Sequence, residues 1–308
     1  ILPDQTAVME MAEASGITLV EEPLNPWKAT STGVGEMILD AVQKGCRKFI
    51  IGIGGSATTE GGIGMLSALG YDFMDENGDR LSPVFDSLEK VVQIKNNRVP
   101  EVLKDCHFQI ACDVTNPLCG ARGCVYVFGA QKGVKEEEKE SMDRAMQSYA
   151  ACLEKFTGKK LSEIPGTGAA GGLGFAFLWG LPNVELKPGI DIVLEAVGLT
   201  NELKDADVVV TGEGCLDFQT AMGKVPVGVA KTEKNYNCKV IAFAGSVTEE
   251  AKNCNEKGID AFFSILPGVC SLDEAMDTEI AQKNMRNAAE QVFRLILACG
   301  KEKSSLHP

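Results

Sequence analysis

Histidine is nearly absent from this sequence, which contains only His107 and His307. His307 lies beside the C-terminus, and His107 opens the apolar run 108–112, so a packed strand residue is its expected role. Histidine-based triads and histidine-ligated metal sites are therefore poor candidates. Acid–base chemistry must then depend on Asp, Glu or Lys.

Long apolar runs and an excess of positive charge are also missing. No run approaches the roughly 20 apolar residues that a bilayer-spanning helix needs, and no signal peptide opens the chain. The formal net charge of −13 argues against a general nucleic-acid-binding surface. We expect neither a membrane nor a nucleic acid as a partner.

Paired cysteines are missing too. The eleven cysteines form an odd set without any Cys-x-x-Cys pair. Most stand in apolar surroundings, which favours buried reduced thiols over a disulfide framework or a zinc site; examples are Cys46, Cys112, Cys152 and Cys299. Reduced thiols predict a cytoplasmic protein.

The chain begins at Ile1 without a methionine and reads there like the interior of a domain, which predicts a fragment of a longer protein. Its 308 residues suffice for one large domain or two ordinary ones. An apolar fraction of 44% is typical of a globular protein.

Glycine, in contrast, is concentrated in loops, and residues 49–65 hold the densest of them. The β-branched run 49–53 predicts a buried strand, and Met65 begins a predicted helix. The loop between them carries one carboxylate, Glu60. Its backbone N–H groups, placed before a helix, can bind phosphate or carboxylate. Tight strand–helix packing would also explain the glycines, but the further glycine loops favour anion binding, with these candidates: Gly54, Gly55, Ser56, Thr58 and Glu60.

Further candidate ligand groups follow in the first half of the chain. Asp113 lies at the end of the predicted strand 107–114, a usual ligand position in α/β proteins, although an Asx-turn cap would explain it as well. A second glycine loop, 165–174, again precedes a predicted helix. Asp191 lies in the first turn of another predicted helix, where stabilising the helix dipole is a sufficient role.

The other elements of the first half are mainly core-forming. A Ser/Thr cluster at 30–33 offers either N-cap residues or an anion site to a helix with Ile38 and Val42 on one face. A long helix beginning near Lys135 has a core-facing stripe: Met142, Met146, Tyr149, Leu153 and Phe156.

Beyond Gly198 strands and helices alternate. The short apolar runs 208–210, 240–243 and 261–266 are typical of a buried parallel sheet. Each is expected to end in a small-residue loop, at 211–214, 244–246 and 267–268. We therefore expect two domains, a mixed α/β domain at 1–198 and part of a parallel-sheet domain at 199–308.

Residues 211–224 gather the groups that phosphoryl transfer requires. Glu213 and Asp217 offer carboxylates for Mg²⁺ or for accepting a hydroxyl proton, and Lys224 can neutralise phosphate charge. Gly212 and Gly214 add backbone that a ligand can approach. The glycine spacing matches neither the Walker motif nor a clean dinucleotide fingerprint. A surface lysine before a helix would explain Lys224 without any function.

Several blocks together resemble the type I glycerate kinases. They occur in the family's order: Gly52–Thr58 with Gly61-Gly62, Ala111–Leu118, Gly168–Gly174, Pro188–Asp191, Thr211–Gly214 and Gly223–Pro226. The sequence departs from the family pattern at Thr59-Glu60, where the family usually has Asn-Asp, and at Cys215, where it often has Arg. The family's N-terminal segment, with a first strand and two loops, is absent.

The resemblance implies phosphorylation of D-glycerate with ATP and Mg²⁺, giving 2-phosphoglycerate, with 3-phosphoglycerate as the alternative product. It implies a doubly wound, flavodoxin- or Rossmann-like parallel-sheet domain, a mixed α/β domain inserted in it, and an active site in the cleft between them. The catalytic candidates, chosen on chemistry, are Glu213, Asp217, Lys224 and Asp113. Asp191, Gly212 and Gly214 join the glycine loop as substrate- or phosphate-binding candidates.

A nucleotide- or dinucleotide-binding oxidoreductase on a similar sheet is the main alternative, and a binding-competent but inactive fragment is another. The sequence does not identify the catalytic base. It also leaves the oligomeric state open, a homodimer included.

Overall fold

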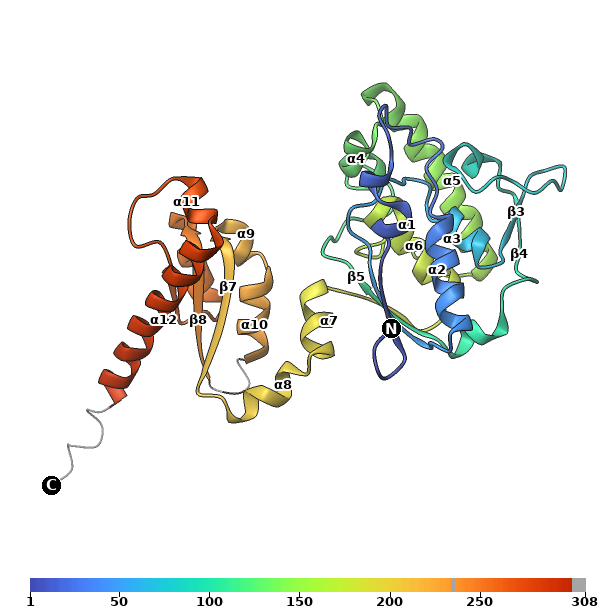
Figure 1. The fold of residues 1–308 in the computed structure, drawn as a ribbon. Helices are drawn as coiled ribbons and strands as arrows, with labels where there is room; N and C mark the ends of the chain where they lie inside the picture. Colours follow the sequence, from blue (N-terminus) through green and yellow to red (C-terminus); the bar gives the residue numbers. More distant parts are fainter. Residues whose placement is uncertain (234–235, 237, 301–308) are drawn as a thin grey trace. The chain divides into compact units, whose positions relative to one another are not determined.

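The computed structural model describes residues 1–233, 236 and 238–300. The chain divides into two compact units, Ile1–Ile192 and Val193–Pro308, and each is described by itself. Figure 1 shows the elements of both units. Among the described residues, no helix is long and apolar enough to cross a membrane.

The first unit is built on a four-stranded parallel sheet with the order β1-β2-β5-β6. Its strands are β1 (Thr6–Glu10), β2 (Lys48–Gly52), β5 (His107–Ala111) and β6 (Val184–Lys187). Phe49 of β2 lies opposite Phe108 of β5, and their rings stack with centroids 4.7 Å apart. A short antiparallel pair, β3 (Asp72–Met74) and β4 (Gln93–Lys95), stands apart from this sheet.

The helices of the first unit supply much of its core. They are α1 (Ala12–Ser15), α2 (Thr32–Gln43), α3 (Ile63–Ala68), α4 (Cys124–Phe128), α5 (Lys139–Thr157), α6 (Leu173–Gly180) and α7 (Gly189–Ala196), whose last turn belongs to the second unit. Short 3-10 turns complete the unit: η1 (Ile17–Leu19), η2 (Phe85–Lys90), η3 (Glu101–Asp105), η4 (Ala130–Lys132), η5 (Glu136–Glu138) and η6 (Ala169–Gly172).

Some local predictions for this unit need correction. His107 begins β5 as a strand residue but is exposed rather than packed, because it stands at the strand's outer end. The long helix α5 begins at Lys139, after the 3-10 turn η5, and its stripe is buried at Met142, Met146, Tyr149 and Leu153. Phe156, in the last turn, is partly exposed.

The second unit contains a three-stranded parallel sheet, β7-β8-β9. The strands are β7 (Val208–Leu216), β8 (Lys239–Val247) and β9 (Ala261–Ser264). Its helices are α8 (Leu199–Glu202), α9 (Phe218–Ala221), α10 (Val225–Glu233), α11 (Leu272–Met276) and α12 (Thr278–Gly300), with 3-10 turns η7 (Leu203–Asp205) and η8 (Glu249–Lys257).

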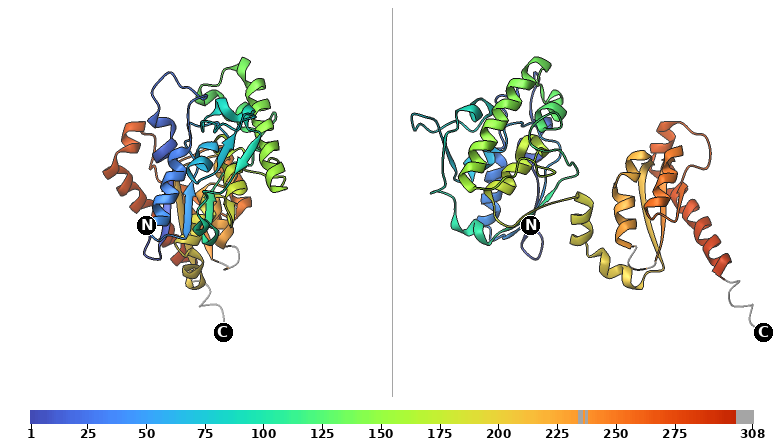
Figure 2. Two further views of the ribbon diagram at one scale, coloured as in Figure 1. Left: turned by 90° about the vertical axis from the view of Figure 1, so that its right-hand side faces the viewer. Right: turned by 180° about the vertical axis from the view of Figure 1, so that it is seen from behind.

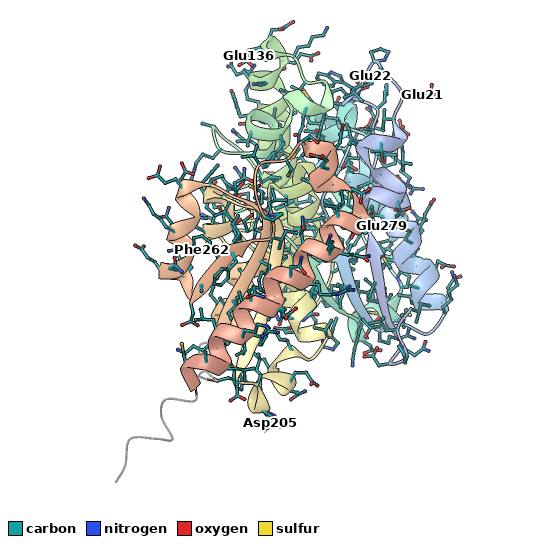
Figure 3. The ribbon with its side chains drawn as sticks, turned by 60° about the vertical axis from the view of Figure 1, so that its left-hand side comes forward. Glu21, Glu22, Glu136, Asp205, Phe262 and Glu279 are labelled. Carbon is teal, nitrogen blue, oxygen red and sulfur yellow. The ribbon has the colours of Figure 1, made fainter. Side chains whose placement is uncertain are left out.

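Helices cover the second sheet on two sides. Figures 1 and 2 show α10 and α12 on opposite sides of the strands. Val292 of α12 packs on Ile241 and Phe243 of β8, whose side chains share one face of the sheet. Figure 3 shows α12, with Glu279 near its start, passing in front of the strands that include Phe262 of β9. Both units thus bear out the predicted α/β class with parallel strands.

The ends of the strands in the second unit differ from the prediction. The segments 211–214 and 244–246 were expected to be loops, but they lie inside β7 and β8. The two strands pair from Val208 opposite Lys239 through to Leu216 opposite Val247, so the small residues continue the ladder instead of ending it. Glu213 is therefore carried on a strand.

Candidate active site

A cavity of about 470 Å³ lies in the first unit, where β2 and β5 end. The carboxyl ends of neighbouring parallel strands form a common edge, so the loops that follow them line the same space. This cavity brings together the first glycine loop, the loop of Asp113 and the second glycine loop. Its lining consists of Ile17, Ile53, Gly54, Gly55, Ser56, Ala111, Cys112, Asp113, Val114, Phe128, Gln131, Lys132, Ala169 and Ala170.

The first glycine loop presents backbone to this cavity. A Cβ added at Gly54 would meet no atom within 4 Å, so a ligand can approach the main chain there. Gly55 has a φ of +71°, a left-handed conformation that favours glycine. Its carbonyl accepts the Ile17 N–H at 2.8 Å, which ties the loop to the preceding segment. In the part of the chain that the structure describes, the N–H groups of Gly54 and Gly55 have no protein acceptor.

Lys132 is a cavity residue that sequence reasoning missed. It is 2% exposed, and its Nζ donates to Ser56 Oγ and to the Thr58 carbonyl, each at 2.6 Å. Burial lowers the pKa of Lys132 to about 8. These contacts join residues more than 70 positions apart, so no local spacing signals them. A single lysine in the largely apolar segment 124–134 is the one hint that the sequence carries.

Glu60 does not face the cavity, and its carboxylate is bound by backbone N–H groups of its own loop and of Ser31. The side chain is fully buried, which raises the pKa of the carboxyl group. It accepts hydrogen bonds from the Ser31 N–H at 2.7 Å, from the Ser31 hydroxyl, and from N–H groups at the start of α3. Glu60 does not line the cavity. Its position indicates that it joins the starts of α2 and α3 and thereby holds the glycine loop in shape.

Ser31 occupies the N-cap position of α2, as the Ser/Thr cluster predicted, but its hydroxyl is bound elsewhere. Its side chain makes no capping bond to α2. Its hydroxyl instead donates to Glu60 and accepts the Met65 N–H at 2.9 Å. Thr58 binds Lys132 through its backbone carbonyl. Its hydroxyl is buried and has no hydrogen-bond partner among the described residues.

Asp113 lines the cavity from the β5 side. Its Oδ1 accepts the Gly189 N–H at 2.9 Å, at the first residue of α7. The carboxylate therefore caps a distant helix and still borders the cavity. Asp191, two residues into the same helix, is exposed and does not line the cavity.

The second glycine loop packs directly on the first. The Gly61 N–H donates to the Gly171 carbonyl at 2.9 Å. Ala170, which lines the cavity, has a φ of 51°, a conformation that costs a non-glycine residue about 1 kcal/mol or more. Strain of this size persists only where the surrounding structure imposes it, as the packed glycine loops do here.

The second unit holds the cluster of Glu213, Asp217 and Lys224. Lys224 Nζ lies 3.4 Å from Glu213 Oε1 and 3.8 Å from Asp217 Oδ1. The Thr220 hydroxyl donates to Glu213 Oε2 at 3.0 Å. Asp217 caps α9 by accepting the Thr220 N–H, and this hydrogen bond is the main reason why its pKa is lowered. The structure thus brings together the three charged residues singled out in this segment.

The two glycines beside Glu213 have different surroundings. Gly212 faces the Phe243 carbonyl of β8, so closely that a Cβ would come within 2.6 Å of the oxygen. A Cβ at Gly214 would meet nothing within 4 Å. Close packing of strands accounts for the first glycine, and the second leaves the backbone beside Glu213 open.

The cluster contains two carboxylates of the type that binds divalent cations. No group of three or more His, Cys, Asp or Glu residues is arranged for a metal ion among the described residues. Mg²⁺, however, is usually held by one or two carboxylates together with substrate phosphates. Glu213 and Asp217, which converge on one lysine, supply hard oxygen donors of this kind.

The fold and the sites define an α/β protein whose first unit has a cavity lined by two glycine loops, Asp113 and Lys132, and whose second unit has a carboxylate–lysine cluster. A family profile described as the glycerate kinase family matches residues 1–297. The chain belongs to this family.

Individual proteins that resemble this chain are glycerate kinases as well. The chain is 42% identical to a glycerate kinase of Bacillus subtilis, over 94% of this chain and 76% of the relative. It is 44% identical to a glycerate 2-kinase of Escherichia coli, over 88% of this chain and 71% of the relative. A crystal structure from Salmonella typhimurium LT2, assigned as glycerate kinase 2, superposes with a TM-score of 0.86 at 40% identity; the match covers 98% of this chain and 78% of the other.

Proposed function

We propose that this protein transfers a phosphoryl group from ATP to the 2-hydroxyl of D-glycerate, with Mg²⁺, and releases 2-phosphoglycerate. The observation that carries the proposal is the cavity of the first unit, in which anion-binding and hydroxyl-binding groups face the same space. Family membership and the glycerate 2-kinase of Escherichia coli support the reaction and its position on the substrate.

The cavity suits a small hydroxy acid. The free N–H groups of Gly54 and Gly55 and the Ser56 hydroxyl are donors for an anionic group. Asp113 is the carboxylate that lines the same cavity, and it orients the substrate hydroxyl and accepts its proton. Uncharged and apolar wall residues, such as Ile53 and Phe128, limit the water around the reacting groups.

The cluster of the second unit suits the phosphates of ATP. Lys224 neutralises phosphate charge, and Glu213 and Asp217 are the residues that would hold Mg²⁺, which would supply charge stabilisation to the transferred phosphoryl group. Asp217 and Thr220 keep the cluster in place through the capping bonds of α9.

Turnover tests the proposal directly. ADP release should depend on both D-glycerate and Mg²⁺, and enolase alone should convert the product, because enolase accepts 2-phosphoglycerate but not 3-phosphoglycerate. Asp113→Asn should lower kcat by about 10²–10⁴-fold. Asn can still accept the Gly189 N–H, so the variant keeps its fold. Absence of glycerate-dependent ADP release from the wild-type protein would refute the function.

A further inference from the structure

Lys132 is a buried ammonium group without a counter-charge. Its contacts with the Ser56 hydroxyl and the Thr58 carbonyl satisfy two of its three N–H donors. Both acceptors are uncharged, and no carboxylate oxygen of the described residues lies within 4.0 Å of Nζ. Since a buried charge without a partner is unfavourable, an anion in the cavity gains most beside this lysine.

The titratable groups that face Lys132 do not supply the missing charge. The Cys124 thiol of α4 is buried, which raises its pKa and keeps it protonated and neutral near pH 7. Glu60 acts on the lysine electrostatically, but its carboxylate is already bound by Ser31 and by N–H groups at the start of α3. Asp113 borders the same cavity, at more than hydrogen-bonding distance from Nζ.

We infer that Lys132 binds the carboxylate of the substrate, together with the N–H groups of Gly54 and Gly55, and so selects hydroxy acids over uncharged polyols. The inference deepens the proposed function and rests on it for the identity of the substrate. It places the substrate's charged end at the lysine and its hydroxyl at Asp113. These two groups then fix the orientation of a molecule that is otherwise small and flexible.

A pair of substrates measures this selection. Glyceramide replaces the carboxylate of glycerate with an uncharged amide and keeps both hydroxyls. Lys132→Gln retains an N–H donor for Ser56 or Thr58 but removes the charge. This variant should raise the KM for D-glycerate about 10- to 150-fold, the value of one charge-assisted hydrogen bond, and should leave the KM for ATP unchanged. Its preference for glycerate over glyceramide should fall by the same factor.

The controls separate binding from structural damage. Lys159, an exposed lysine of the same unit, gives the matched variant Lys159→Gln, which should behave like the wild type. If Lys132→Gln keeps the wild-type KM for glycerate, or loses glyceramide turnover equally, Lys132 does not bind the carboxylate.

A measurement of ligand binding to the wild-type protein tests the inference without a variant and without enzymatic turnover. Calorimetry should show that D-glycerate affinity falls about tenfold per pH unit above pH 8, where Lys132 loses its proton, while glyceramide affinity stays constant. A D-glycerate affinity that is constant up to pH 10 would overturn the inference. Binding with this pH profile but without ADP release would instead refute the proposed function and leave the carboxylate site standing.

Discussion

The buried charge of Lys132 should make the stability of the first unit rise with pH in alkaline solution, relative to a variant that lacks the titrating group. In the folded protein burial lowers the pKa of Lys132 from 10.5 to about 8. Between these values the unfolded chain binds a proton that the folded chain does not. Stability therefore rises with pH in this window, and below pH 8 the full penalty for burying the charge is present. Lys132→Met removes the titrating group and with it this pH dependence.

The size of the effect follows from the shift. One pKa unit corresponds to about 1.4 kcal/mol, so a shift from 10.5 to about 8 corresponds to about 3 kcal/mol. The wild type should gain this free energy of unfolding, relative to Lys132→Met, between pH 7.5 and about 10.5. Lost hydrogen bonds to Ser56 and Thr58 shift the two curves by a constant amount and do not change the pH slope.

Urea denaturation followed by tryptophan fluorescence measures the effect. Both tryptophans, Trp27 and Trp179, lie in the first unit, so the signal reports the unit that contains Lys132. Other groups that titrate in this range are shared by the two proteins and cancel in the difference. The exposed Lys159 provides the control variant Lys159→Met, for which the difference from the wild type should not change with pH. A constant difference for Lys132→Met as well would refute the assignment of a buried, partnerless charge.

The remaining predictions concern the loop and the second unit. Glu213→Gln and Asp217→Asn should each lower ATP-dependent turnover by about 10²-fold or more, because charge stabilisation dominates phosphoryl transfer, whereas Asn still caps α9; wild-type rates in both variants would exclude these residues from the mechanism. Gly54→Ala should raise the KM for glycerate at an unchanged urea midpoint, since its Cβ enters open space, and an unchanged KM would contradict the role of this N–H. Gly55→Ala, at a φ of +71°, should lower the free energy of unfolding by about 1 kcal/mol. Glu60→Gln should lower it by roughly 1–3 kcal/mol, because buried N–H donors lose an acceptor, and a urea midpoint equal to that of the wild type would contradict its structural role.

The local elements around the site were largely predictable. The apolar run of β2, the glycine loop after it and the start of α3 are signals between neighbouring residues, and they appear where the sequence predicts them. The same holds for Asp113 after β5. Because parallel strands share one edge, following each strand to its end was enough to place these loops near one another.

Other features depended on contacts that no local pattern carries. The carboxylate of Glu60 belongs to a glycine loop whose composition favours ligand binding, but Ser31, the residue that precedes α2, binds it instead. The segment 211–214 has the composition of a loop, yet pairing with β8 extends the strand through it.

The sequence by itself determined the α/β class, the glycine loops and the family, because these follow from short-range patterns and from motifs in a set order. Only the tertiary structure decided which polar groups face the cavity and which are used up inside the protein. It turned Glu60 into the loop and set Lys132 beside Ser56, since the choice between binding a ligand and binding the backbone depends on what other segments bring into contact.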